Sequence, residues 1–419
     1  MSTTLENNYN IRLERYNEAV SKNNVSRAVA GQAPRLDLNS SYEWGYSDAE
    51  LQTLPLGSPE GGGGGSNPPL ELEGTAQTLQ VQPQLSVPIF TGFRNKYRYQ
   101  QLENTHRMSE LQQQAAVEQA LASTVSAYLE VARRQSQLEI DQENIAISYD
   151  RWRRVSEDAT FGAANSVRRL QAEVDLKTDS ANYRNTLLAY HNSRRDLNLL
   201  MAQPPEQEFV VQTELTLSED LVYDRLRADM ARHNTQLSLS DRSIDQAVYQ
   251  TKISEASYYP TLQGYANYTY FDTENEANFL QSNIAYGPNV GVTLSWNLFN
   301  GGANKIQRQN AQIQLEQQET ARGSTALQLE KELRNAYAQY ANNREQRRIE
   351  ESNLPTFERN YSKMQEDYKL GLVDAADLRT AQLNLAAARN RINNLTYTIK
   401  QSEIRLLQLS GRLGDSSSL

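Results

Sequence analysis

The sequence predicts a mainly α-helical chain that carries four membrane-spanning β-strands. Three observations lead to this fold class. Four short segments alternate strictly between apolar and polar residues, they lie in two pairs between very long stretches of helix-forming composition, and the whole arrangement occurs twice. Because successive side chains of a strand point to opposite faces, each alternating segment has one apolar face and one polar face. A tilted strand of about 9 to 11 residues is long enough to cross a bilayer.

The strands are predicted at residues 34–46 and 79–90 in the first pair and at 260–271 and 289–299 in the second. A single segment of this kind is better explained as a half-buried strand of a soluble sheet, but four in duplicate favour a membrane sheet. Their apolar faces include aromatic residues that suit the edges of a membrane, namely Tyr42, Trp44, Tyr46, Tyr268, Tyr270 and Trp296. Their polar faces, which suit a water-filled lumen, include Gln80, Gln82, Gln84, Thr293, Ser295 and Asn297.

The bulk composition restricts the function classes. Only 38% of the 419 residues are hydrophobic and the mean hydropathy is −0.71, which favours an elongated protein over a compact globule. A net charge of −9 argues against a nucleic-acid partner, because phosphate binding needs a basic surface. The absence of cysteine excludes disulfides, thiolate metal sites and a cysteine nucleophile. The sequence has no run of 18 apolar residues, so we expect no transmembrane helix.

Each pair of strands is followed by a long stretch rich in Ala, Gln, Glu, Leu and Arg, from about residue 92 to 160 and from about 301 to 369. At 1.5 Å per residue, each helix would extend roughly 100 Å. Pro355 is expected to interrupt or kink the second helix. Glycine turns at Gly162 and Gly371 end the two helices, and returning helices complete two long hairpins.

The two halves of the chain align with each other. Asn8 and Pro34 correspond to Asn234 and Pro260 at an offset of 226 positions, and after the first strand pair the offset becomes 209. We therefore predict a first repeat at 1–203, a linker at 204–218, a second repeat at 219–411 and a disordered tail at 412–419. The extra residues of the first half contain five consecutive glycines, which fit either an exposed natural loop or an engineered linker. The N-terminus has no secretory signal, and we expect that a targeting segment and about one helix have been removed.

Four strands cannot close a cylinder, and the edges of an open sheet in lipid would leave backbone groups unpaired at several kcal/mol each. Copies of the chain must therefore associate. Two copies would give a nearly filled barrel of eight strands, whereas three would give twelve strands and room for water.

Over nearly its whole length the chain resembles the TolC family of outer-membrane efflux and secretion channels. The resemblance is carried by Leu5–Arg12, a proline that opens the first strand of each pair, Phe-Thr-Gly-Phe at 90–93, Phe-Asn-Gly-Gly at 299–302 and the segment 368–378. It implies a homotrimer with a 12-stranded β-barrel in the outer membrane, continued by a barrel of twelve helices in the periplasm. It further implies an exit duct of a tripartite efflux pump or a type I secretion system, passive itself, with a periplasmic adaptor and an inner-membrane transporter as partners.

The resemblance also implies a gate at the helical tips. Counted from Gly371, the family's narrowing positions are Tyr368, Asp377 and Thr380. Thr380 replaces an acidic residue, so we expect one acidic ring instead of two and weaker block by multivalent cations. Asp374 is expected to cap the following helix, and capping is also the alternative role for Asp377. The adaptor is expected to contact the tips at Gly162, Ala163, Gly371, Leu372 and Val373.

Opposite charges gather at the two tips. Arg151, Arg153, Arg154, Arg168 and Arg169 lie near Gly162, and Glu366, Asp367, Asp374 and Asp377 lie near Gly371. We hypothesise that Arg168 pairs with an acid of the second tip and latches a closed state. The alternative is that these arginines are solvated, because exposed ion pairs contribute only about 0 to 1 kcal/mol each.

Two other function classes are less consistent with the sequence. A periplasmic adaptor or coiled-coil scaffold would also have long helical hairpins, but a duplication with four aromatic-edged strands is not expected there. An enzyme is disfavoured, because no phosphate loop, nucleophile elbow or Cys/His pairing is present. His106, His191 and His233 are expected to be surface helix residues, and we predict no metal and no cofactor.

Overall fold

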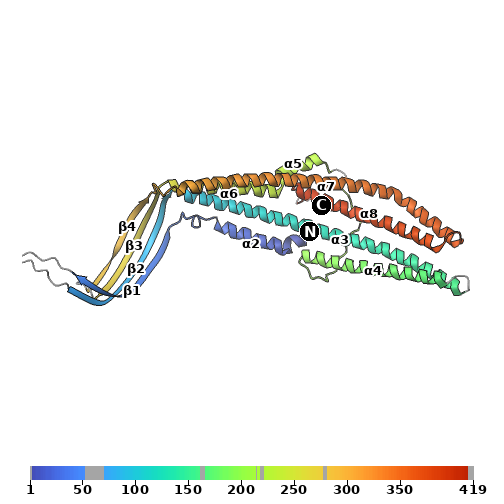
Figure 1. Cartoon of the computed structure of the whole chain (residues 1–419), viewed down its shortest axis with the longest axis horizontal. Helices are drawn as coiled ribbons and strands as arrows, with labels where there is room; N and C mark the ends of the chain where they lie inside the picture. The colour runs from blue at the N-terminus through green and yellow to red at the C-terminus, as the bar shows by residue number, and fades with distance from the viewer. Residues whose placement is uncertain are drawn as a thin grey trace, which may run out of the picture. The chain divides into compact units, whose positions relative to one another are not determined.

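The computed structural model describes residues 2–51, 70–160, 166–213, 215–217, 221–276 and 281–413. The elements follow the same order in both halves, a helix, two strands, a helix of 67 residues and a returning helix of 35 residues (Figure 1). The helices are α1 Ser2–Asn7, α2 Tyr9–Asn24, α3 Arg94–Thr160, α4 Ser166–Leu200, α5 Tyr223–His233, α6 Thr235–Glu255, η1 Ala256–Tyr258, α7 Ala303–Lys369 and α8 Ala375–Leu409. Of the helices described, none has both the length and the apolar content needed to cross a membrane.

The chain divides into two compact units. The helical unit comprises Met1–Val20, Arg107–Ser243 and Gln318–Leu419, and the sheet unit comprises Ser21–His106 and Ile244–Gln317. Each unit takes residues from both halves of the chain, so neither unit corresponds to one predicted repeat.

The sheet unit contains four antiparallel strands in the order β1-β2-β3-β4. They span Arg35–Leu51, Leu70–Thr91, Thr261–Asn275 and Ser282–Ser295. Most of the strand termini extend the strands further than predicted. At its C-terminal end β4 is shorter than predicted, because it stops one residue before Trp296, which was expected inside the strand. The indole nitrogen of Trp296 instead donates a hydrogen bond to the carbonyl of Tyr258, 3.1 Å away.

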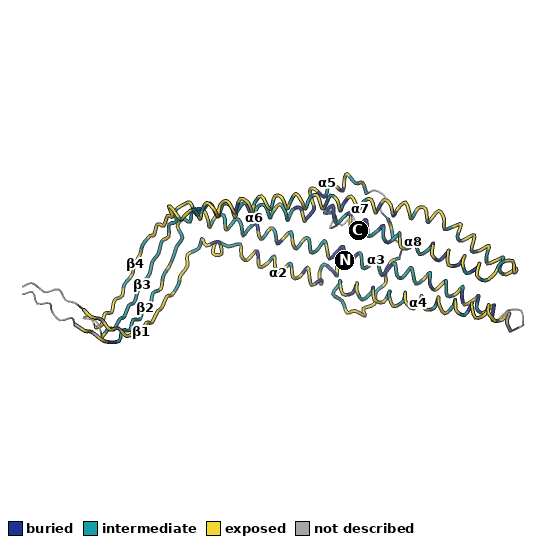
Figure 2. Tube along the Cα trace, in the orientation of Figure 1, coloured by how far each residue is buried: buried dark blue, intermediate teal, exposed yellow. Residues whose placement is uncertain are grey.

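The strand register brings the four predicted apolar faces onto one side of the sheet. Leu36 lies opposite Leu85, Leu85 opposite Ala266, and Ala266 opposite Val290. The predicted apolar alternation is therefore confirmed as a continuous face. The neighbouring row is polar throughout and consists of Asp37, Gln84, Asn267 and Asn289. The outer strands β1 and β4 are exposed along most of their length (Figure 2).

The helical unit contains the two predicted hairpins, α3 with α4 and α7 with α8. Helix α7 continues through Pro355 without a break, so the expected interruption is not found. The long helices lie in the order α4-α3-α8-α7 (Figure 1). Hydrogen bonds link each neighbouring pair: Thr186 to Asp141 at 2.7 Å, Arg133 to Asn394 at 2.8 Å and Arg391 to Glu350 at 2.8 Å.

Two clusters of buried apolar residues stabilise this unit. One gathers around Leu129, Leu197 and Ile404, and the other around Leu333, Ile399 and Leu406. Leu413, expected in a disordered tail, is fully buried in the first cluster, and Arg412 forms an ion pair with Asp229 at 3.3 Å. The chain end is therefore packed through Leu413, and the rest of the predicted tail lies outside the described residues, as does the five-glycine run.

Candidate functional site

The second helical tip has well-defined cap structures at both of its helices. Gly371 adopts φ +74°, its N–H donates to the carbonyl of Tyr368, and the N–H of Leu372 donates to the carbonyl of Asp367. This pair of hydrogen bonds is a Schellman motif, which requires a left-handed residue and so favours glycine. The Asp374 carboxylate accepts from the backbone N–H groups of Ala376 and Asp377, at 2.8 and 2.9 Å, which confirms the predicted N-cap.

Replacing Asp374 with alanine should remove this cap and destabilise the first turn of α8 by about 1 kcal/mol. Amide hydrogen exchange should then become faster at Ala376 and Asp377. Asp377→Asn, whose side chain makes no cap hydrogen bond, is the control. Unchanged exchange rates in Asp374→Ala would show that the cap contributes nothing.

Most of the predicted gate residues lie around one hollow in the helical unit. Arg168 from α4, Tyr368 from α7, and Asp374 and Asp377 at the start of α8 all line this tip hollow, which has a volume of about 700 Å³. Its other charged residues are Arg154, Glu157 and Lys369, and Gly371, Leu372 and Val373 also line it. The hollow therefore brings three basic and three acidic side chains of both hairpins together.

Two of the predicted positions do not belong to this group. The hydroxyl of Thr380 donates to the carbonyl of Ala376 at 2.9 Å, and Thr380 does not line the tip hollow. Gly162 and Ala163 lie outside the described residues. The second tip also presents two apolar side chains to solvent, since Leu370 and Leu372 are each more than two-thirds exposed.

A buried charge cluster that the sequence analysis missed joins the two hairpins. The guanidinium of Arg379 on α8 donates two hydrogen bonds of 2.7 Å to the carboxylate of Asp179 on α4. Ser148 on α3 donates to the same carboxylate. The side chains of Arg379 and Asp179 are only 13% and 6% exposed. We call this cluster, together with the adjacent pair Arg151–Asp175, the tip clamp.

Arg151 was grouped with the arginines near Gly162, for which solvation was the alternative to a latch, but Arg151 is not solvated. Its side chain is 4% exposed and pairs with Asp175. Burial lowers the pKa of Arg151, and attraction to Asp175 opposes that effect. Burial also acts to lower the pKa of Arg379, but hydrogen bonding and attraction to Asp179 outweigh it and raise that pKa. Among the described residues, Nε and Nη1 of Arg151 have no hydrogen-bond partner.

A helical signal in the sequence could have indicated the clamp. Ser148, Arg151 and Val155 recur at intervals of three and four, which places them on one face of α3, and Val155 is buried. Asp175 and Asp179 have the same four-residue spacing on α4. Polar residues at positions that should be apolar indicate a buried polar contact.

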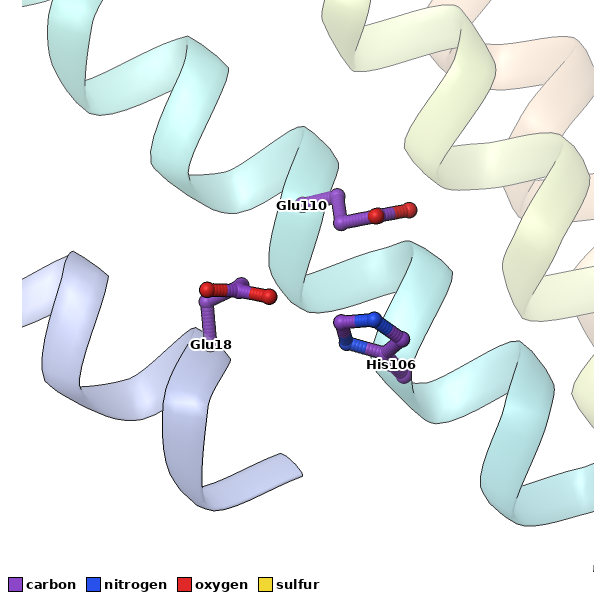
Figure 3. A group of neighbouring side chains, drawn as sticks. All are labelled: Glu18, His106 and Glu110. Atoms are coloured by element: carbon purple, nitrogen blue, oxygen red, sulfur yellow. The ribbon is translucent and has the colours of Figure 1, made fainter. Parts of the chain in front are cut away.

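The histidines differ from one another. His191 and His233 are exposed, as predicted, but His106 is half-buried and lies 3.3 Å from the hydroxyl of Ser21. Glu110 follows His106 by one helical turn on α3, and Figure 3 shows both side chains with Glu18 of α2. Carboxylate oxygens of Glu18 and Glu110 approach within 4.8 Å. The absence of a metal stays a prediction.

Known proteins were compared with this chain and structure. The family model described as outer membrane efflux protein matches residues 1–203 and 226–412. No curated protein sequence matches. Solved structures with the same fold include the Campylobacter jejuni CmeC outer membrane channel, at a TM-score of 0.76 and 16% identity, covering 98% of this chain and 84% of that one. The Vibrio cholerae outer membrane protein VceC is similar at a TM-score of 0.77 and 15% identity, covering 98% of this chain and 94% of that one. The open state of the Neisseria gonorrhoeae MtrE outer membrane channel is similar at a TM-score of 0.73 and 15% identity, covering 98% of this chain and 88% of that one.

Proposed function

The chain belongs to the outer membrane efflux protein family, and from this membership we propose how its copies assemble into a gated duct. The protein is an efflux channel, an exit duct of the outer membrane whose helical part lies in the periplasm. Its family is one of channels, not of enzymes. The assembly, the gate and the partners described next are the proposal.

Three copies form the duct through the two open edges of the sheet unit. Strands β1 and β4 are the edges of the four-stranded sheet. In lipid their unpaired N–H and C=O groups would each cost several kcal/mol, so β4 of one copy must pair with β1 of the next. Three copies supply twelve strands, enough to leave a lumen bordered by the polar row of Asp37, Gln84, Asn267 and Asn289.

The helical unit has matching edges. Helices α4 and α7 lie at the two ends of its four-helix order, and each carries large apolar side chains that this chain leaves uncovered. On α4 these include Leu170, Val174 and Leu188, each more than half exposed, and on α7 they include Leu327, which is 72% exposed. We assign these residues to the contact between α7 of one copy and α4 of the next, which closes a tunnel of helices.

The continuous apolar face of a sheet with two open edges is the observation that carries this proposal. Its test is the state of the purified protein. We expect a complex of three chains that stays in solution only with detergent. A monomer that remains dissolved without detergent would overturn it. Copurification with a periplasmic adaptor and an inner-membrane transporter would separate efflux-pump from secretion partners.

We propose that the tip hollow is the gate. Arg168 lies in the same hollow as Asp374 and Asp377, and attraction across the hollow would hold the second hairpin against the first. Tyr368 lines the same hollow. We propose that the adaptor contacts the exposed apolar residues Leu370 and Leu372 at the tip.

Arg168→Glu should open this gate more often. The substitution replaces attraction to Asp374 and Asp377 with repulsion, and because an exposed pair contributes at most about 1 kcal/mol, the open fraction should rise by up to about fivefold. Single-channel recording in planar bilayers measures it. Arg169→Glu, on the same turn but outside the hollow, is the charge-matched control, and Asp377→Arg should reverse the effect of Arg168→Glu. Unchanged gating in Arg168→Glu would exclude the latch.

A further inference from the structure

The junction between β2 and α3 has an unusual backbone. Two consecutive residues, Gly92 and Phe93, adopt left-handed conformations with φ of +62° and +68°. Glycine is required at the first, because a Cβ there would lie 2.6 Å from the carbonyl oxygen of Ala256. An aromatic residue at the second is strained, because a left-handed backbone is unfavourable for a residue with a Cβ.

The second half of the chain provides an internal comparison. At the offset of 209 positions, Gly92 and Phe93 correspond to Gly301 and Gly302, which adopt φ of +65° and +86°. The same left-handed turn is thus built from two glycines in one half and from glycine and phenylalanine in the other. Because glycine would remove the strain, the ring of Phe93 must provide something that offsets it.

The ring of Phe93 belongs to an aromatic group at the end of the sheet. It packs edge-to-face against Phe90, with ring centroids 5.2 Å apart, and against Tyr259, with centroids 5.8 Å apart. These contacts leave 47% of Phe93 exposed. Packing between the rings therefore uses only part of the ring surface.

A β-bulge turns further apolar residues to the same side. Pro88 pairs with Gln263 and Phe90 with Leu262, so Ile89 is the additional residue of β2. The shift places Phe90 opposite Leu262, on the apolar face of the sheet. A Cβ built on Gly264, which belongs to that face, would lie 3.4 Å from Cδ1 of Ile89, and Ile89 is 55% exposed.

These residues line a hollow of about 310 Å³ whose lining residues are half apolar and half polar. The apolar wall is formed by Pro88, Ile89, Phe90 and Phe93, and the polar rim by Gln32, Asn95 and Lys96. Gln32 donates to the carbonyl of Asn95 at 2.9 Å, which fixes the rim. Lys96 is exposed and forms no ion pair within the part of the chain that the structure describes.

We propose that this junction hollow binds one phospholipid of the periplasmic leaflet, with the phosphate at Lys96 and an acyl chain along Ile89, Phe90 and Phe93. The location supports this occupant, since the strands lie in the outer membrane and the helices in the periplasm, so the change from β2 to α3 occurs at the level of the head groups. The apolar wall continues the lipid-facing side of the sheet. An exposed aromatic ring suits the acyl chain of a lipid at this depth, and the cation beside it suits the phosphate.

Native mass spectrometry of the detergent-solubilised protein, titrated with phosphatidylglycerol, tests the proposal. Phe93→Gly copies the turn of the second half, so it should fold while binding lipid about tenfold more weakly. Phe93→Trp should restore binding. Lys96→Gln should weaken binding about fivefold, whereas Lys305→Gln, its counterpart at the other junction, should not. Glycerol 3-phosphate, a head group without acyl chains, should not displace the lipid.

Equal lipid retention in wild type and Phe93→Gly would overturn the proposal, as would equal weakening by Lys96→Gln and Lys305→Gln. A lower melting temperature of Phe93→Gly with lipid retention unchanged would assign the ring to packing alone. The proposal rests on the outer-membrane location. A detergent-independent monomer would remove that premise, whereas a detergent-dependent trimer without the lipid difference would refute only the lipid site.

Discussion

Asp179→Ala should lower the free energy of unfolding of the helical unit by about 3 to 5 kcal/mol. The substitution leaves the guanidinium of Arg379, only 13% exposed, without its bidentate partner. Ser148 loses its acceptor at the same time. A buried charge without a partner costs more than the pair contributes, because the desolvation of the guanidinium is no longer offset. Guanidinium chloride unfolding of the detergent-solubilised protein, followed by helical circular dichroism, measures the loss.

Two further variants make this prediction specific. Arg153→Ala removes an arginine of the same helix as Ser148 whose pair with Asp150 is exposed and 3.5 Å long, so it should change stability by less than about 1 kcal/mol. Asp179→Ala combined with Arg379→Met removes both charges and should recover much of the lost stability. Equal losses for Asp179→Ala and Arg153→Ala would mean that the tip clamp does not stabilise the fold.

The clamp also limits which segments can move at the gate. Arg379 lies four residues after the start of α8 at Ala375, which is about 6 Å along the helix. Because α3, α4 and α8 are tied together at this level, we expect the proposed gate to open mainly through movement of the segments beyond the clamp. The residues proposed for the gate, Arg168, Asp374 and Asp377, all lie closer to the tips than Asp179 and Arg379 do.

The sequence predicted the long elements closely and the strand ends poorly. α3 was expected at about 92–160 and is found at Arg94–Thr160, because breakers and glycine turns mark both ends. β2 was expected from residue 79 but begins at Leu70. The segment before 79 still alternates, but its apolar residues Leu70, Leu72 and Ala76 are at even positions, whereas those from Leu79 onward are at odd positions. The apolar pattern of the predicted strand therefore does not continue into it. Pairing with β1, which a local pattern does not show, extends the strand.

For the candidate sites, too, local features were predicted and long-range contacts were not. The N-cap at Asp374 was predicted because capping depends on residues two and three positions away. The pair of Asp179 and Arg379 was not, because 200 positions separate the two residues and only the packing of α4 against α8 brings them together. The left-handed conformation of Phe93 was also missed, although the aligned Gly302 is a signal that the turn favours glycine.

Val290→Arg should cost about 2 to 4 kcal/mol of stability in a membrane. Val290 lies five residues before the end of β4 at Ser295, about 17 Å along the strand, which places it near the middle of an apolar band about 25 Å tall. Its neighbours on the same face are Ala266 and Leu85, so a guanidinium there would have lipid around it and no partner across the sheet.

The matched control is Asn289→Arg, one residue earlier and on the opposite face beside Asn267. Urea unfolding of protein refolded into bilayers compares the two variants. In a water-filled barrel Asn289→Arg should be nearly neutral, so only the change at Val290 should destabilise. In a soluble scaffold the result would differ, because Val290 is 83% exposed and a charge on an exposed strand usually changes stability by less than about 0.5 kcal/mol. Two neutral variants would therefore contradict the assignment of the apolar face to lipid, even for a protein that forms trimers.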